Sequence, residues 1–234
     1  MSYVVFNTDK INIFIFVIDK SSSMSGSESD MVKGLKLFKE SFVGFSESDS
    51  IAVSVCKFSD NFYPGRFVKV EDIDTSYSAD GCTALYHSIV EGAKYVNKYV
   101  DEVIREYKIV PRVTFVLFSD GEPFNDKRSR SEAVQAIQNL NNAGTTTVFV
   151  AFGSAINSNF GKSLGFMATI DVINRETLSQ FFGVDLSRSC QEQSRSYAAL
   201  GSNFFSQAAD KSSSNAYSAI TNQALEDTSW LDEI

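Results

Sequence analysis

The chain has 234 residues, of which 43% are hydrophobic and 20 are phenylalanine, so it can build one large domain with a substantial core. Its formal net charge is −8. This acidic balance argues against a nucleic-acid partner and against an anionic membrane surface, because both attract proteins with clustered lysine and arginine.

Cysteine usage and the first residues indicate a compartment. The three cysteines, Cys56, Cys82 and Cys190, are far apart and form no CxxC pair, so neither a disulfide framework nor a zinc cage is indicated. The start, MSYVVFNTDK, lacks a basic leader, and the apolar run at residues 11–18 is far shorter than the roughly 20 residues of a membrane helix. We therefore expect a soluble, cytoplasmic protein.

The first half of the chain alternates between strand and helix patterns. Residues 11–18 (INIFIFVI) form a nearly continuous apolar run, which is typical of a central parallel strand covered on both faces. Apolar residues at helical spacing over residues 31–45 predict a helix. Residues 51–58 (IAVSVCKF) predict a second strand, and residues 66–70 a shorter third strand.

The alternation continues from Thr83, which begins a helix with an apolar side extending to residue 103. Residues 113–118 (VTFVLF) predict a strand, 133–140 a helix, and 147–152 (TVFVAF) another strand. A short helix at 160–166, a strand at 170–173 and a helix at 176–182 complete the series. This order predicts an α/β domain over residues 1–189, with a Rossmann-like, open, mostly parallel sheet and helices on both faces.

Beyond this domain the composition shifts. Residues 190–234 are rich in serine, alanine, asparagine and glutamine, and they contain the only tryptophan of the chain. We interpret them as a polar C-terminal tail, partly helical or flexible. Trp230, Leu231 and Ile234 make this tail a candidate docking segment.

Two of the expected strands end in an acid. Asp19 follows the first strand in DKSSS, and Asp120 follows the fourth in SDGEP. Because ligands of such sheets bind at the carboxyl ends of the strands, both acids are expected on one edge. Ser21 and Ser23 share the i, i+2, i+4 spacing with Asp19, and Thr83 begins a helix after Gly81. Carboxylate and hydroxyl oxygens suit a hard cation such as Mg²⁺.

Taken together and in this order, DKSSS, GCT and SDGEP resemble the metal-ion-dependent adhesion site (MIDAS) of von Willebrand factor A (VWA) domains, over roughly residues 10–185. The resemblance implies a VWA fold and Ser21 and Ser23 as direct metal ligands. Thr83 would bind directly or through water, with Asp19 and Asp120 hydrogen-bonded to the ligands and waters. It further implies Mg²⁺, with Mn²⁺ or Ca²⁺ as alternatives, and an Asp or Glu of a partner protein completing the coordination.

Other residues near these motifs have plainer interpretations. Cys82 stands where the family commonly has glycine or another small residue, and Asp80 adds a carboxylate close by. Glu122 and Asp126 are interpreted as solvated side chains or as part of an acceptor surface. His87, the only histidine, is interpreted as a structural or surface residue.

The favoured hypothesis is a metal-dependent, protein-binding adaptor that is not an enzyme. It resembles intracellular bacterial stand-alone VWA proteins of the tellurite-resistance and stress-response kind. One alternative is a structural subunit of a larger assembly, for example with an AAA+ ATPase. A metal-dependent hydrolase is less favoured, because two-metal chemistry needs more converging carboxylates than this sequence offers.

Overall fold

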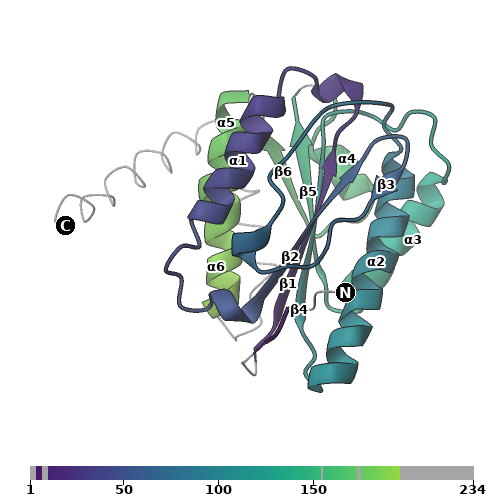
Figure 1. Ribbon diagram of the computed structural model, residues 1–234. Helices are drawn as coiled ribbons and strands as arrows, with labels where there is room; N and C mark the ends of the chain where they lie inside the picture. The colour runs from purple at the N-terminus through teal and green to yellow at the C-terminus, as the bar shows by residue number, and fades with distance from the viewer. Residues whose placement is uncertain (1–3, 7–9, 154, 173–174, 196–234) are drawn as a thin grey trace.

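The computed structural model describes residues 4–6, 10–153, 155–172 and 175–195 (Figure 1). Within these residues a six-stranded sheet has the order β3-β2-β1-β4-β5-β6. Its strands are β1 (Asn12–Asp19), β2 (Ile51–Phe58), β3 (Phe62–Tyr63), β4 (Arg112–Ser119), β5 (Thr146–Phe152) and β6 (Ala168–Val172). All neighbouring strands pair in parallel except β3, which pairs antiparallel to β2. The predicted mostly parallel α/β sheet is therefore confirmed.

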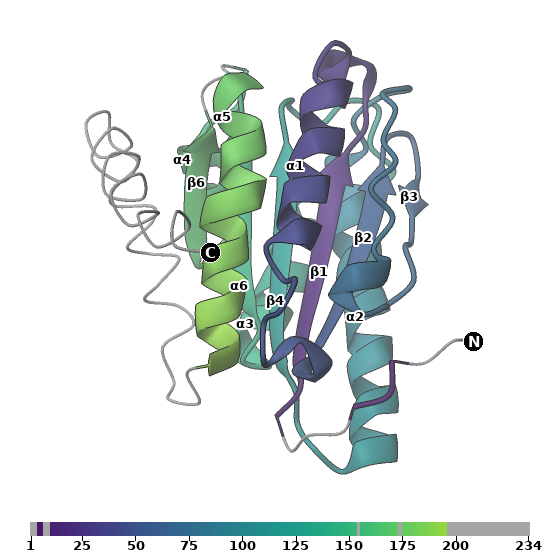
Figure 2. The ribbon, with the colours of Figure 1, turned by 60° about the vertical axis from the view of Figure 1, so that its left-hand side comes forward.

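Helices cover both faces of this sheet. They are α1 (Glu28–Glu40), α2 (Leu85–Tyr107), α3 (Arg130–Asn142), α4 (Ser158–Ser163), α5 (Arg175–Gln180) and α6 (Ser187–Arg195). A π-helical turn, Phe181–Leu186, joins α5 to α6. Figure 2 shows α1 and α6 side by side on one face, while α2 lies behind the sheet. Within the described residues, no helix has the length and hydropathy needed to cross a bilayer.

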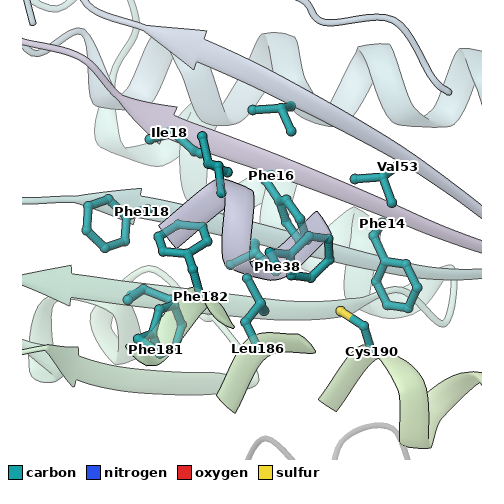
Figure 3. Close-up of a cluster of buried hydrophobic side chains, with 14 of the residues drawn as sticks. Phe14, Phe16, Ile18, Phe38, Val53, Phe118, Phe181, Phe182, Leu186 and Cys190 are labelled. Atoms are coloured by element: carbon teal, nitrogen blue, oxygen red, sulfur yellow. The ribbon is translucent and has the colours of Figure 1, made fainter. Parts of the chain in front are cut away.

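Strand β1 shows why its sequence reads as one apolar run. Phe14, Phe16 and Ile18 point into the core beneath α1 and α6, and the alternate residues point into the core beneath α2 and α3. In the first core the rings of Phe16 and Phe38 meet edge to face with centroids 5.1 Å apart (Figure 3). Because both faces are covered, every residue of this strand is buried.

The predicted strand at residues 66–70 is wrong. The edge strand next to β2 is β3, and Val68 contributes only an isolated antiparallel bridge to Val53. Between them, the Gly65 carbonyl accepts a hydrogen bond from the Ser54 hydroxyl (2.9 Å). A Cβ at Gly65 would lie 2.1 Å from the carbonyl oxygen of Val55. This close approach and the side-chain bond interrupt the ladder, so no continuous strand forms.

Several predicted helix boundaries also differ. Helix α1 ends at Glu40, and Phe42 and Phe45 lie in the turns that follow. These turns are closed by i→i−3 hydrogen bonds, such as Phe45 N to Phe42 O (3.1 Å), so both rings keep a near-helical spacing and stay buried. The helix expected at 160–166 begins earlier, at Ser158, because the Asn157 side chain caps it.

The helix expected at 176–182 is longer than its apolar pattern suggests. It continues through the π-helical turn into α6, which extends across the expected domain limit at residue 189. Cys190 is fully buried in the core shared with α1. The rest of the predicted tail, residues 196–234, lies outside the described residues.

Candidate metal site at the carboxyl edge of the sheet

The site lies where β1 and β4 end side by side. These strands pair in parallel with Ile18 opposite Phe118, so Asp19 and Ser119 follow as neighbours at the same edge. Asp19 is fully buried, whereas Ser23, on the short helix Ser22–Met24, is exposed. At the carboxyl edge, the acid of Asp19 is therefore buried within the protein, and the Ser23 hydroxyl lies nearer the surface.

A line of hydrogen bonds connects the predicted residues. The Ser21 and Ser23 hydroxyl oxygens lie 3.0 Å apart, and the Ser23 hydroxyl donates to the Asp120 carboxylate (2.8 Å). One oxygen of Asp19 accepts the backbone N–H of Ser21 (2.8 Å), and the other accepts the Ser119 hydroxyl (2.6 Å). Because both oxygens of Asp19 are held in this way, this carboxylate is placed to act through the serines.

Thr83 reaches the same point from the start of α2. A Cβ placed on Gly121 would lie 3.6 Å from the Thr83 hydroxyl oxygen and 3.7 Å from the Ser23 hydroxyl oxygen. The structure thus brings Asp19, Ser21, Ser23, Thr83 and Asp120 together around the bare backbone of Gly121. Their role as metal ligands stays a prediction, but this set of hydroxyl and carboxylate oxygens is of the kind that suits a small hard cation.

The electrostatics favour a cation at this point. Burial raises the pKa of Asp19 to about 6, although hydrogen bonds from Ser119 and Ser21 act in the opposite direction. Burial also raises the pKa of Asp120. Neither carboxylate forms an ion pair within the described part of the chain. Two partly desolvated acids without a cationic side chain would both be stabilised by a bound cation.

The described residues offer no cluster of three or more His, Cys, Asp or Glu side chains suited to a metal ion. A cation held at this edge would therefore depend on serine and threonine hydroxyls together with Asp19 and Asp120. This donor set excludes the sulfur and nitrogen cages typical of structural zinc.

Two supporting residues escaped the sequence analysis. The Ser119 hydroxyl bonds Asp19, and its only sequence signal is its place directly before the strand-end Asp120. The Tyr77 hydroxyl donates to the backbone carbonyl of Asp19 (2.5 Å), for which the sequence gives no signal. The loop 77–82 is tied further to the first motif, because Ser22 N donates to Gly81 O (2.9 Å). This loop therefore braces the candidate site.

The mostly parallel sheet with helices on both faces is an α/β fold of the VWA type, and hydroxyl and acidic side chains gather at its carboxyl edge. No protein-family profile matches the chain, and no curated protein matches it. Solved structures do share its fold. The pilus adhesin SpaC from Lactobacillus rhamnosus GG in its open conformation is 11% identical with a TM-score of 0.62, covering 80% of this chain and 30% of the adhesin.

Two further structures of the same fold were solved with metal. Manganese-loaded TRAP protein from Plasmodium vivax is 15% identical with a TM-score of 0.53, covering 75% of this chain and 74% of that one. Proximal thread matrix protein 1 from the mussel byssus, with a zinc-occupied MIDAS motif, is 17% identical with a TM-score of 0.54, covering 77% and 46%. The chain thus spans less than half of the adhesin and of the byssus protein. At these identities the likeness shows the fold alone.

Proposed function

We propose that this protein is a protein-binding module that depends on a divalent cation. The observation that carries the proposal is the hydrogen-bonded line from Ser21 through Ser23 to Asp120, set over the buried carboxylate of Asp19. The hydroxyls of Ser21, Ser23 and Thr83 would hold the cation. When bound, such a cation supplies an electrophilic centre that attracts an Asp or Glu of a partner protein.

The residues of the chain have distinct tasks in this proposal. Asp19 orients Ser21 through its backbone N–H, and Ser119 holds the far oxygen of Asp19. Asp120 accepts from the Ser23 hydroxyl and so turns the lone pairs of that oxygen toward the centre of the site. With few charged oxygens in direct contact, the cation would keep much of its attraction for an incoming carboxylate. An acidic protein would in this way bind an acidic partner segment.

We further propose Mg²⁺ as the ion and an adaptor role without catalysis, in the cytoplasm and in stress response. The oxygen donors suit Mg²⁺, and they also tolerate Mn²⁺, the ion named for the TRAP structure. All cysteines of the chain are free thiols, two of them buried, which suits a reducing compartment. Docking through the C-terminal tail remains a prediction on residues outside the described part.

The first experiment measures the metal alone. Mn²⁺ binding, followed by electron paramagnetic resonance with Mg²⁺ as competitor, should be lost or weakened at least about tenfold in Ser23→Ala and Thr83→Ala. Ser22→Ala is the matched control, because this exposed serine lies between the proposed ligands and should leave binding unchanged. A wild-type protein that binds neither ion, or alanine variants that bind normally, would refute the proposed site.

The second experiment tests the partner. Immobilised wild type and Thr83→Ala are each used to capture proteins from the source cell, with Mg²⁺ or with EDTA. The proposal expects a partner that is lost in both the variant and the chelated sample. Replacing single Asp and Glu residues of that partner by Asn and Gln should then identify one acid that is required. A partner retained under every condition would place the interface elsewhere.

A further inference from the structure

Helix α2 begins without a side-chain cap of its own. Its N-cap position is Ala84, whose methyl group cannot accept a hydrogen bond from the first turn. The carboxylate of Asp126 takes that place from a distant part of the chain. It accepts the backbone N–H of Tyr86 (2.6 Å) with one oxygen and that of His87 (2.9 Å) with the other.

Asp126 belongs to the loop that begins at Asp120, the strand-end acid of the last predicted metal motif. Its carboxylate also accepts the backbone N–H of Arg128 (3.1 Å), which folds the end of this loop around it. A second link joins the same two segments, because the Phe124 N–H donates to the carbonyl of Thr83 (3.0 Å). The loop carrying Asp120 and the helix start carrying Thr83 are thus tied directly to one another.

We propose that Asp126 is a positioning residue for the metal site, an inference that rests on the proposed function. Thr83 lies just ahead of the first turn of α2, and Asp120 lies on the loop that supplies the cap. By joining the two, the Asp126 carboxylate fixes the spacing between the Thr83 hydroxyl and the group that orients Ser23. A small hard cation demands closely fixed oxygen positions, so its affinity depends on this spacing.

The negative charge of Asp126 contributes as well as its shape. A carboxylate at a helix N-terminus is favoured by the partial positive charge of the unpaired N–H groups. An asparagine keeps one carbonyl acceptor but loses the charge and the second acceptor oxygen. Asp126→Asn should therefore lie between wild type and Asp126→Ala in any property that depends on this cap.

A second acid of the chain provides a control, because it also accepts a backbone N–H at a helix start but lies away from the metal site. Asp171, on β6, accepts the backbone N–H of Ser158 at 2.6 Å, at the start of α4, where the Asn157 side chain also accepts the N–H of Asn159. Strand β6 is separated from β4 by β5, and Asp171 has no bond to either metal-site loop. Removing this acceptor at a helix start should lower stability without altering the metal site.

The test is the dissociation constant for Mn²⁺ of the full chain, measured where circular dichroism shows each variant folded. We expect binding to weaken about ten- to hundredfold in Asp126→Ala, to weaken less in Asp126→Asn, and to stay unchanged in Asp171→Ala. If Asp126→Ala does not fold, the comparison of Asp126→Asn with Asp171→Asn decides the question.

The outcomes separate the two proposals. Wild-type binding together with unchanged affinity in the Asp126 variants overturns the positioning role alone. Equal losses in the Asp126 and Asp171 variants also overturn it, because they would indicate a general effect of stability. A wild type that binds no metal overturns the proposed function and this inference with it.

Discussion

Asp19 sets the chemistry of the site at the scale of single residues. Its carboxylate is fully buried beneath the hydroxyl groups, and its oxygens are held by Ser21 and Ser119. Burial still raises its pKa to about 6, because these neutral donors replace only part of the lost hydration. In the protein without metal, the ionised form of Asp19 is therefore destabilised by desolvation, and a bound cation would offset this cost.

A pH dependence of stability follows for the protein without metal. The pKa of Asp19 is about 6 in the folded state against 3.8 for an aspartate of the unfolded chain, so folding favours the protonated acid. This contribution is fully present below about pH 4 and is lost as the pH rises through about 6. Urea unfolding in EDTA should show that decline, and Mg²⁺ should offset it above about pH 6.

The control for this prediction is Asp19→Asn, in which the part of the decline due to this carboxylate should disappear. A wild type and an Asp19→Asn variant with the same pH profile in EDTA would contradict the prediction. Ser119→Ala provides a second check, since it removes a donor that lowers the pKa of Asp19. The decline should then extend to a higher pH.

The sequence pointed to the residues that we propose as metal-binding, and the structure brings them together, but it did not point to the residues that hold them in place. Asp19, Ser23 and Thr83 stand out because their types and spacing fit a metal site. Asp126 was interpreted as solvated or as part of an acceptor surface, whereas it accepts three backbone N–H groups. One signal was present: Ala84 precedes the helix without a capping side chain, so the cap had to come from elsewhere.

The loop after β4 is the element most suited to recognise a partner. Its backbone is fixed to Thr83 and to the start of α2, yet the Phe124 side chain remains 68% exposed. An exposed aromatic ring on a tethered loop beside the proposed cation site offers contact area at a low cost in conformational entropy. The residue next to the acid of the partner would pack against this ring.

Phe124→Ala should accordingly weaken partner binding by roughly tenfold while the affinity for Mn²⁺ stays unchanged. The measurement is a titration of the captured partner in the presence of Mg²⁺. Val43→Ala is the control, because Val43 is 84% exposed on the turn after α1, away from the loop that follows β4. Unchanged partner affinity in Phe124→Ala would remove this loop from the interface.

The elements were predictable wherever both faces of a strand or one side of a helix are buried. Strands β1, β2, β4 and β5 read correctly because continuous apolar runs reflect cover on both faces. The segment 66–70 was wrongly predicted as a strand, because only Val68 pairs with the sheet, through a single bridge to Val53 and not through a ladder. Tertiary contacts, here those of Gly65 with β2, decided the outcome.

At the scale of the whole molecule, the described part of the chain has a hydrophobic core on each face of the sheet, with the strands between them. Alternation of strand and helix predicted this layering, since it permits few other arrangements. The extent of the last helix was not predictable. The π-helical turn shifts the apolar spacing between α5 and α6, so the pattern breaks while the helix continues.

Helix α6 covers one of these cores at the amino end of β4, the end opposite the candidate metal site. The Gln193 side chain accepts from Thr114 (2.8 Å), and its backbone carbonyl accepts from Arg112 (3.0 Å). Beneath the helix, Cys190 lies near Phe14 and Leu186 with no exposed surface (Figure 3). Burial also raises the pKa of the Cys190 thiol well above its ordinary value.

Because the Cys190 thiol is buried, the rate at which a reagent labels it can report how often α6 separates from the sheet. With Cys56 and Cys82 replaced by alanine, a thiol reagent can modify Cys190 only when α6 separates from the sheet or the whole domain unfolds, so the labelling rate reports such an opening. Gln193→Ala should speed labelling severalfold, because it removes the side-chain bond to Thr114. Equal labelling rates with and without this bond would mean that the reagent reaches Cys190 only when the entire domain unfolds. The labelling rate would then measure the lifetime of the folded state.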